Sequence, residues 1–376
     1  MTPGVTHIIP LTQRPGGFPF AGAETQLFTL MEAQQSRGID VELIVLLELD
    51  GPLIRDKLRE LEAQGVRVMV VPWRRTFDLR TIRRLRRLLI TRRDRIIHTH
   101  LAAADHNGKI GAFLARCRYV VSTVHNQQVR YHKRKWRLAL PLLNRMTRHS
   151  IAISESVRNF MITVERTPPD RITVIPYGIR ESKTLPRDAA RRHLNLPPDA
   201  FVVGFVGRFV PQKNLPLLIE AAARLKTEIP DLCVALVGGG ELEDTLRAQV
   251  QRLQANNVLL CGYHADGPAL MPALDALCLP SSWEGLGSVL IEAMMAGVPV
   301  MGSRAGAIPE VLGDGAFGLL FEAGNTDGLA EAIRTLHALP DRGASMADRA
   351  REHARATYTV DRMAERTLAV YRDVMA

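Results

Sequence analysis

Residues 277–300 read LCLPSSWEGLGSVLIEAMMAGVPV and fall into three parts. The apolar LCLP predicts the end of a buried strand, and SSWEGLG predicts a tight loop. SVLIEAMMA predicts a short helix with Ser288 as its N-cap and Gly297 just past its end, before VPV begins another strand. The segment therefore predicts a strand–loop–helix–strand unit whose loop delivers Glu284 to the carboxyl edge of a parallel sheet, where ligands bind in open α/β folds.

A second glutamate, Glu292, follows Glu284 by eight positions. On one continuous helix this spacing would separate the side chains by ~80°. Glu284 precedes the helix, however, so the two carboxylates can bind different parts of one long ligand. The free N–H groups at the helix N-terminus suit a negatively charged or hydroxyl-rich ligand. A glutamate pair at this spacing also occurs by chance in helix-rich proteins, and it is the surrounding motif that favours a functional pair.

Composition places the chain among globular proteins of more than one domain. It has 376 residues, of which 46% are hydrophobic, and no apolar run approaches the ~20 residues of a membrane span. The N-terminus lacks the form of a signal peptide, and the four cysteines show no metal or redox spacing. We therefore expect a cytoplasmic protein with buried, reduced thiols.

Short apolar, β-branched segments alternate with helical stretches in both halves of the chain. They predict an α/β fold of two doubly wound, Rossmann-like domains, each with a parallel sheet between helices. The polar, proline-containing residues 180–200 suit a junction between the domains. The expected domains are residues 1–180 and 181–355, followed by a helix over residues 356–376.

Two cations follow the strand that ends at Gly207. Arg208 and Lys213 lie in GRFVPQKN, residues 207–214, just before a helix that begins near Leu215. Two cations beside a helix N-terminus at the carboxyl edge of a sheet suit a diphosphate, although a pair of solvated surface cations would look the same in isolation.

Glycines follow the next strand in VGGGELEDTL, residues 237–246, where Glu241 opens the following helix. Gly238 and Gly240 would permit close approach of a nucleotide to the backbone, whereas an ordinary turn needs only one glycine. In the first half, the long loop of residues 12–27 is glycine-rich and includes Gly22. His125, in STVHN, ends a strand, and His98 and His100 in IIHTHL are weaker candidates of the same kind.

These motifs together resemble the retaining glycosyltransferases of family 4, which have the GT-B fold of two Rossmann-like domains facing across a cleft. The resemblance implies that residues 356–376 return to the first domain. It implies transfer of a hexosyl or N-acetylhexosaminyl group from a nucleoside-diphosphate sugar, a UDP-sugar rather than a GDP-sugar, with neither a cofactor nor a metal. The implied catalytic residues are Arg208, Lys213, Glu284 and His125.

The family's donor-binding residues match Gly22, Gly207, Gly238, Gly240, Tyr263, Glu284, Gly285, Leu286, Gly287 and Glu292. By resemblance, Arg208 and Lys213 neutralise the leaving diphosphate, and Glu292 binds the ribose hydroxyls. Glu284 and the backbone of EGLG bind the donor sugar, and His125 lies near its 6-position. The family's GG-x-E loop is matched by residues 21–24, in which alanine replaces the first glycine.

The positive charge is concentrated in the first half: residues 1–180 carry 30 Lys and Arg against 15 Asp and Glu. Residues 73–95 hold ten arginines, and Leu79, Ile82, Leu85, Leu88 and Leu89 recur there at helical spacing. Residues 130–148 add seven cations, with Tyr131 and Trp136 among them. An anionic membrane surface is the favoured partner, a solvated surface is the plain alternative, and no nucleic-acid motif accompanies the charge.

The expected acceptor of the sugar is a lipid-linked glycan, a lipopolysaccharide or an exopolysaccharide intermediate, with the enzyme peripheral at the inner face of the membrane. A soluble small-molecule acceptor is the alternative within enzymes. A non-catalytic sugar-nucleotide-binding protein is the alternative from another class, and donor hydrolysis or transfer would separate it from an enzyme.

Overall fold

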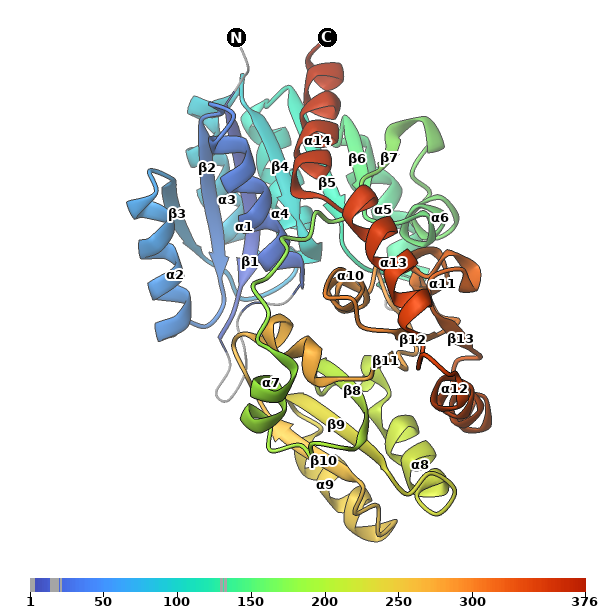
Figure 1. Cartoon of the computed structure of the whole chain (residues 1–376). Helices are drawn as coiled ribbons and strands as arrows, with labels where there is room; N and C mark the ends of the chain where they lie inside the picture. The colour runs from blue at the N-terminus through green and yellow to red at the C-terminus, as the bar shows by residue number, and fades with distance from the viewer. Residues whose placement is uncertain (1–3, 14–19, 21, 129–130, 132–133) are drawn as a thin grey trace. The chain divides into compact units, whose positions relative to one another are not determined.

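The chain forms two compact units. The structure, a computed structural model, describes residues 4–13, 20, 22–128, 131 and 134–376. Unit 1 comprises residues 1–178 together with 360–376, and unit 2 comprises residues 179–359 (Figure 1). The unit borders therefore fall at 178 and 359, where the sequence placed them at 180 and 355. Gly16, Gly17 and Ala21 of the glycine-rich N-terminal loop lie outside the described residues.

Unit 1 contains a parallel seven-stranded sheet in the order β3-β2-β1-β4-β5-β6-β7. Strand order reverses between β1 and β4, which makes this pair the topological switch point. The strands are β1 (Val5–Leu11), β2 (Val41–Leu47), β3 (Arg67–Pro72), β4 (Ile96–His100), β5 (Tyr119–Val124), β6 (His149–Ala152) and β7 (Ile172–Val174).

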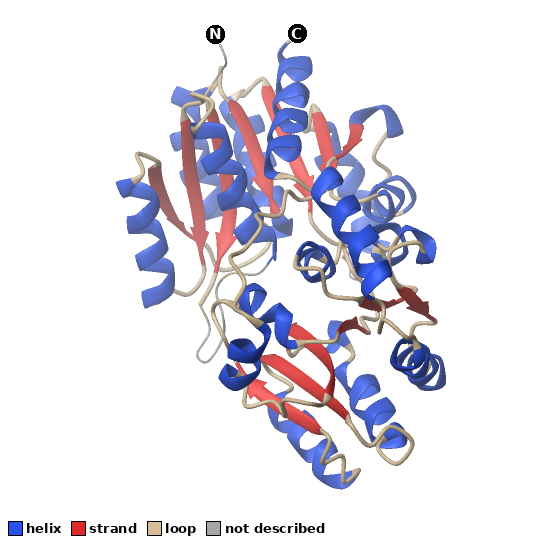
Figure 2. Ribbon diagram, in the orientation of Figure 1, coloured by secondary structure: helices blue, strands red, loops and turns tan. Residues whose placement is uncertain are grey.

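Helices cover both faces of this sheet (Figure 2). Two separate hydrophobic clusters occupy the two faces: one includes residues of α1, α2 and α14, and the other residues of α3 and α4. The helices are α1 (Gly22–Gln35), α2 (Pro52–Ala63), α3 (Leu79–Leu89), α4 (Leu101–Ala115), α5 (Arg134–Arg145), α6 (Glu155–Thr163) and α14 (Val360–Met375).

The last helix, α14, belongs to unit 1 although more than 180 residues of unit 2 precede it in the chain. Its apolar side chains Met363, Val370 and Val374 join the core beside α1. Arg366 donates a hydrogen bond to the carbonyl of Val174, which fixes the helix to the end of β7. These contacts make α14 part of the unit 1 core.

Unit 2 repeats the same strand order in a parallel six-stranded sheet, β10-β9-β8-β11-β12-β13, with its switch point between β8 and β11. Its strands are β8 (Phe201–Arg208), β9 (Leu232–Gly239), β10 (Val258–Gly262), β11 (Ala276–Leu279), β12 (Val300–Ser303) and β13 (Leu319–Phe321). Its helices are α7 (Arg187–His193), α8 (Leu215–Leu225), α9 (Glu243–Arg252), α10 (Ser288–Met295), α11 (Ile308–Val311), α12 (Thr326–Ala338) and α13 (Ala344–Thr357). The predicted fold class is confirmed.

Across the described residues, no helix combines the length and the hydropathy that crossing a bilayer requires. The four cysteines are all free thiols. Cys233 and Cys278 are buried as expected, whereas Cys117 and Cys261 are only partly buried.

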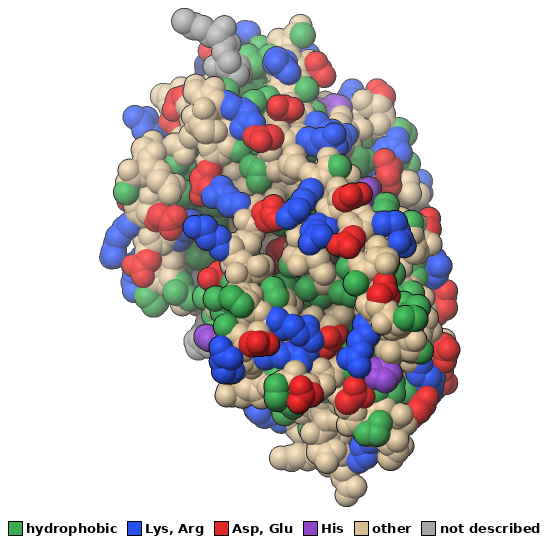
Figure 3. Space-filling view, in the orientation of Figure 1, with side chains coloured by type: hydrophobic (Ala, Val, Ile, Leu, Met, Phe, Trp, Pro, Cys, Tyr) green, Lys and Arg blue, Asp and Glu red, His purple; other side chains and the backbone are tan. Residues whose placement is uncertain are grey.

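The arginine-rich segment forms an amphipathic helix, α3, whose polar side carries arginines alone. Ile82, Leu85 and Leu89 are buried, but Leu79 is exposed, because it lies in the first turn beyond the edge of the core. Two arginines after the helix are used within the fold: Arg92 pairs with Glu42 at 2.6 Å, and Arg95 pairs with Asp40. By contrast, acidic and basic side chains are interspersed over α14 (Figure 3).

The expectation that Tyr131 and Trp136 present aromatic rings to a membrane is wrong. Tyr131 is 4% exposed and Trp136 is 7% exposed. Both rings pack with His106 and Phe160 in a small core below α5, and the Tyr131 hydroxyl lies 3.0 Å from Nε2 of His106. The cations in this segment of the sequence predicted an exposed surface, but these two aromatic side chains pack inward.

Candidate functional site

Three loops meet at the carboxyl edge of the unit 2 sheet. They follow β8, β9 and β11, which are neighbours in the sheet. The loop after β8 is bonded to both others: Phe209 N–H donates to the Gly239 carbonyl at 2.8 Å, and the Gln212 carbonyl accepts from Ser282 N–H at 2.9 Å. The GRFVPQKN, VGGGE and SSWEGLG motifs therefore form one continuous surface at the switch point.

Lys213 and Glu284 form an ion pair within this surface. The Nζ atom of Lys213 lies 2.5 Å from Oε2 of Glu284, and both side chains are largely buried. Ser281 Oγ also donates to that carboxylate at 3.2 Å, and Gln212 Nε2 donates at 3.4 Å. The glutamate therefore holds the lysine in a defined position at the start of α8.

Arg208 is available to an anion. It is the last residue of β8, its side chain is exposed, and no described residue forms a hydrogen bond or ion pair with its guanidinium. One of the two predicted cations is thus held by a carboxylate, and the other, at the same sheet edge, has no bonding partner among the described residues.

Glycine is required where the first two loops approach each other. A Cβ atom on Gly238, whose φ is 145°, would lie 1.9 Å from the carbonyl oxygen of Gly207. Gly240 stands against the backbone of Phe209 in the same way. The helix after these glycines, α9, begins at Glu243, so the expectation that Glu241 opens it is wrong by two residues.

Gly287, rather than Ser288, is the N-cap of α10. Its φ of 83° is left-handed, and Ser288 is the first helical residue. Glycine adopts this conformation without the penalty that a side chain would incur, which turns the chain sharply from loop into helix. The Ser288 prediction is wrong because a preferred capping residue type does not reveal the backbone conformation of its neighbour. Gly297 does follow the helix end, with φ 74°.

Glu292 lies in the wall of a cavity of about 190 Å³ within unit 2. Residues 179–184 of the interdomain segment and Arg351 and Arg355 of α13 form the other walls. Burial raises the pKa of Glu292 to about 7, although the charge of Lys213 acts in the opposite direction. No described residue forms a hydrogen bond with its carboxyl group. A carboxyl group whose pKa is shifted by burial in the wall of a cavity is a candidate for a functional site.

The remaining donor-binding candidates differ in what they can offer. Gly285 and Leu286 lie in the loop beside Glu284, but Leu286 is buried in the core, so only its backbone can contact a ligand. Tyr263 follows the edge strand β10 and is 53% exposed. The structure thus gathers the cations, the glycines and both glutamates at one sheet edge, with Tyr263 at its margin.

Two candidates, His125 and Gly22, belong to unit 1. Gly22 is the first residue of α1. His125 follows β5 and is buried, with Nδ1 2.7 Å from the Tyr177 hydroxyl and Nε2 3.2 Å from Nδ1 of His100. Burial lowers the pKa of His125 to about 3. A cavity of about 30 Å³ lies against His125, Tyr177 and Gln26 at the carboxyl edge of the sheet.

Comparison with known proteins identifies the family. Residues 186–355 match the family described as Glycosyl transferases group 1, and residues 20–183 match Glycosyltransferase Family 4. The UDP-Gal:alpha-D-GlcNAc-diphosphoundecaprenol alpha-1,3-galactosyltransferase of Escherichia coli is 31% identical over 270 residues, which are 68% of this chain and 70% of that protein. The chain belongs to glycosyltransferase family 4.

Further similar proteins differ in how much of their length matches this chain. The D-inositol 3-phosphate glycosyltransferase of Stackebrandtia nassauensis is 32% identical over 236 residues, which are 59% of this chain and 53% of that protein. The crystal structure of Anabaena HepE in complex with UDP has a TM-score of 0.82 and 26% identity, and the match covers 98% of this chain and 100% of that one. The family 4 prediction and the GT-B fold are confirmed, and the protein is a glycosyltransferase with relatives that use nucleotide-sugar donors.

Proposed function

We propose that this glycosyltransferase moves a hexosyl or N-acetylhexosaminyl group from a UDP-sugar to a hydroxyl of a lipid-linked glycan, with retention of the anomeric configuration. The observation that carries the proposal is the pair of cations at the unit 2 sheet edge, Arg208 free and Lys213 positioned by Glu284. The HepE crystal structure is a complex with UDP, which supports the choice of base, and the name of the Escherichia coli relative includes a diphosphoundecaprenol acceptor.

The barrier in such a transfer is departure of an anionic diphosphate from a sugar carbon that becomes positively charged. Arg208 and Lys213 stabilise the negative charge that develops on the leaving oxygen, and cations fixed in advance do this without reorganisation. Glu292 accepts hydrogen bonds from the ribose hydroxyls, because its carboxyl group faces an open cavity. Glu284 and the backbone of residues 285–287 bind the hydroxyls of the donor sugar.

Glu284 and Glu292 do not act as the paired carboxylates of a retaining glycosidase. That chemistry needs one carboxylate as a nucleophile and the other as a proton donor on either side of the scissile bond. Here Glu284 is bound to Lys213, and Glu292 comes from the second turn of the following helix. The leaving phosphate itself then accepts the proton of the attacking hydroxyl. No residue in this scheme requires a bound metal or a cofactor.

The donor and the stereochemistry can be tested on the intact chain. UDP should raise the thermal denaturation temperature more than GDP does, because a ligand present at ~100 times its Kd stabilises the native state by ~2.7 kcal/mol. Transfer from a UDP-sugar to a polyprenol-diphosphate sugar should give the donor's own anomeric configuration in the NMR spectrum of the product. An inverted product, or binding of UDP-sugars without either transfer or hydrolysis, would overturn the proposal.

A soluble acceptor is the second candidate, favoured by relatives whose names include D-inositol 3-phosphate and alpha-maltose-1-phosphate. The same assay distinguishes the two, since polyprenol-linked sugars and soluble sugar phosphates can be offered in parallel. Turnover confined to the soluble compounds would favour this candidate.

The lipid-linked acceptor implies docking on an anionic membrane, and α3 provides a surface for it. Arg83, Arg84, Arg86 and Arg87 are exposed on one helix, and Arg86 donates a hydrogen bond to the carbonyl of Leu114 on α4. Leu114 is 47% exposed, and its neighbour Phe113 is 60% exposed. Exposed apolar side chains beside a row of arginines fit the boundary between lipid headgroups and acyl chains. Phe113 and Leu114 would therefore supply the apolar membrane contact that the buried Tyr131 and Trp136 cannot supply.

Liposome co-sedimentation is expected to show salt-sensitive binding to anionic vesicles and none to neutral ones. Changing Arg83, Arg84, Arg86 and Arg87 together to Glu should abolish it, since each cation near the surface contributes ~1 kcal/mol. The matched control changes the exposed cations Lys183, Arg192, Arg252 and Arg349 of unit 2 to Glu, with the same change in net charge. If both variants lose binding equally, net charge alone explains it. Wild type that ignores anionic vesicles at low salt would leave the arginines as a solvated surface.

A further inference from the structure

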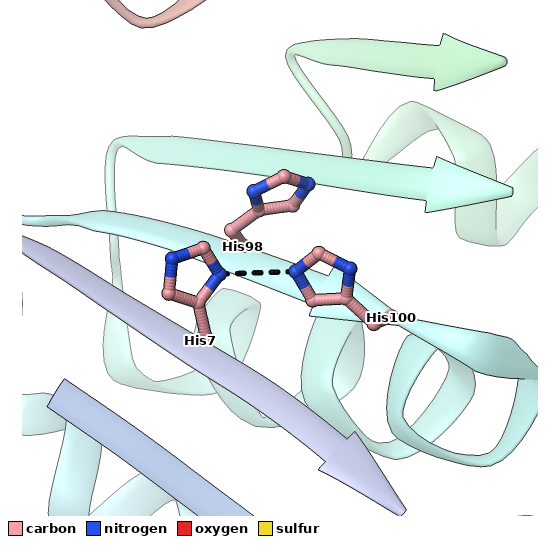
Figure 4. Close-up of side chains that lie close together, drawn as sticks. All are labelled: His7, His98 and His100. Atoms are coloured by element: carbon pink, nitrogen blue, oxygen red, sulfur yellow. Dashed lines mark hydrogen bonds between the residues drawn. The ribbon is translucent and has the colours of Figure 1, made fainter. Parts of the chain in front are cut away.

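A buried network of histidines occupies the switch point of the seven-stranded sheet. His7 lies on β1, His98 and His100 lie on β4, and His125 follows β5. All four are buried. His7, His98 and His100 lie close together, with a hydrogen bond between His7 and His100 (Figure 4).

Hydrogen bonds, rather than metal coordination, account for this arrangement. Three histidines whose nitrogens lie within 4.8 Å of one another could surround an ion. Both nitrogens of His7, of His98 and of His100 already have protein partners, however. An ion would have to displace several of these bonds in a buried place that supplies no negative ligand among the three residues.

One chain of bonds runs from Gln34 to Tyr177. The Oε1 atom of Gln34 lies 2.8 Å from His7 Nε2, His7 Nδ1 lies 3.0 Å from His100 Nε2, and His100 Nδ1 lies 3.2 Å from His125 Nε2. His125 Nδ1 then lies 2.7 Å from the Tyr177 hydroxyl. A carbonyl oxygen can only accept, so His7 Nε2 must carry the hydrogen. A neutral imidazole has one N–H, so each later histidine must donate through Nε2 and accept at Nδ1.

A second chain starts from the other end of the same amide. The Nε2 atom of Gln34 donates to the Tyr371 hydroxyl at 3.3 Å. That hydroxyl lies 2.6 Å from His98 Nδ1, and His98 Nε2 lies 2.7 Å from Thr123 Oγ1. Tyr371 therefore donates to His98, which donates to Thr123. Rotating the amide by half a turn would move the hydrogen to the other nitrogen on all four histidines.

The histidines are neutral, as this assignment requires. Burial lowers the pKa of His7 to about 4 and that of His125 to about 3. Burial also lowers the pKa of His98 and His100 well below the usual value for histidine. Each ring then holds a single proton near neutral pH.

We propose that Gln34 is a positioning residue, because the orientation of its side-chain amide sets which nitrogen of His7, His100 and His125 carries the hydrogen. As a result, His125 Nδ1 accepts the hydrogen of the Tyr177 hydroxyl, and the ring offers no N–H to the adjoining cavity. Gln26 lies in the wall of the same cavity, and no described residue forms a hydrogen bond with its buried Oε1 atom. The Gln26 oxygen can only accept, and His125 donates nothing there, so the cavity suits a hydroxyl group and rejects a carboxylate or phosphate.

Two-bond ¹H–¹⁵N NMR spectra at pH 8 test the network without reference to activity. In wild type, His7, His98, His100 and His125 should all carry hydrogen on Nε2. In Gln34→Glu, both carboxylate oxygens accept, so Tyr371 must donate to Glu and can no longer donate to His98. His98 alone should then change to the Nδ1–H form, while the other three histidines keep Nε2–H.

Tyr371→Phe supplies the matched control. Without the hydroxyl, His98 should keep Nε2–H, both alone and combined with Gln34→Glu. In Gln34→Met, which leaves the amide end without a partner, His7, His100 and His125 should show one common fraction of Nδ1–H. Different fractions at the three histidines, or an unchanged His98 in Gln34→Glu, would overturn the proposal.

The link to transfer rests on the proposed function, through the contact of His125 with the donor sugar. Gln34→Met should lower kcat on the order of tenfold, about the value of one hydrogen bond, with UDP affinity unchanged. Gln34→Glu should keep kcat at the wild-type value, because it leaves the hydrogen on Nε2 of His7, His100 and His125. Tyr371→Phe should leave the rate unchanged. If the NMR spectra are as expected but kcat of Gln34→Met is unchanged, the proposed effect on transfer through His125 is wrong, and the hydrogen-bond network stands.

Discussion

Arg208→Ala is expected to lower turnover on the order of a hundredfold or more, because it removes one of two cations that stabilise the leaving diphosphate. The side chain is exposed, and no described residue bonds to it, so the substitution removes no hydrogen bond or ion pair between described residues. Folding should therefore be intact, and steady-state kinetics would report the loss of transition-state stabilisation alone. Arg252→Ala, at the exposed end of α9, is the matched control and should be neutral.

Lys213→Ala should lower turnover at least as much as Arg208→Ala does, but a second effect has to be separated from the loss of the cation. Lys213 lies 2.5 Å from a carboxylate that is largely buried, and removing it leaves Glu284 without its cation. Lys213→Gln keeps a hydrogen-bond donor for Glu284 and removes only the charge. A hundredfold loss in Lys213→Gln, with an unchanged thermal denaturation temperature, assigns the effect to the diphosphate. Near-wild-type turnover in both Arg208→Ala and Lys213→Gln would end the diphosphate assignment.

The alternation of strands and helices was open to prediction because buried parallel strands are short β-branched runs. The two sheets follow from those runs, since right-handed crossovers leave few other arrangements. The gathering of Arg208, the glycines and Glu284 also follows, because parallel strands bring their carboxyl ends to one edge. The family resemblance supplied the roles of these residues towards the diphosphate, the ribose and the sugar, which the spacing of the residues does not indicate.

Contacts between distant segments were not open to prediction. Lys213 and Glu284 are 71 positions apart, and Gln34 and Tyr371 are 337 apart. The sequence around Lys213 does not indicate that its ammonium group pairs with Glu284. The sequence of α1 likewise does not indicate that the Gln34 amide bonds to the Tyr371 hydroxyl of α14. His125 illustrates the consequence: its place at a strand end was predicted, but its bonding partners were not.

Local chemistry also misled where two signals overlapped. Tyr131 and Trp136 lie among cations, and the charges indicated an exposed surface, whereas the rings pack inward. Ser288 is a favoured capping residue type, but the positive φ of Gly287 ends the loop one residue earlier. In both cases the outcome depended on the path of the backbone, which sets where a side chain points and where a helix begins. The type of a single residue does not determine that path.

The two glutamates should separate nucleotide binding from transfer. Glu292→Gln is expected to weaken UDP affinity on the order of tenfold, because a neutral amide is a poorer acceptor for ribose hydroxyls than a carboxylate. Glu284→Gln should lower transfer while UDP still binds, since Gln can still accept a hydrogen bond from Lys213. Calorimetry with UDP and steady-state kinetics on both variants, with the exposed Glu352→Gln as control, would measure the division.

Glu292→Gln should also stabilise the free protein at pH 8, and this gives the assignment an independent check. The pKa of Glu292 is about 7 in the folded protein and 4.5 in the unfolded reference, so the native state holds the proton more tightly. The cost of burying the charge is absent below about pH 4.5, grows as pH rises, and is complete above about 7. Gln carries no charge, so the free energy of unfolding of this variant should exceed that of wild type by about 3 kcal/mol at pH 8 and by less than about 1 kcal/mol at pH 5. Equal loss of UDP binding in both glutamate variants, or no gain in stability for Glu292→Gln at pH 8, would contradict a buried Glu292 carboxylate whose role is to bind the nucleotide.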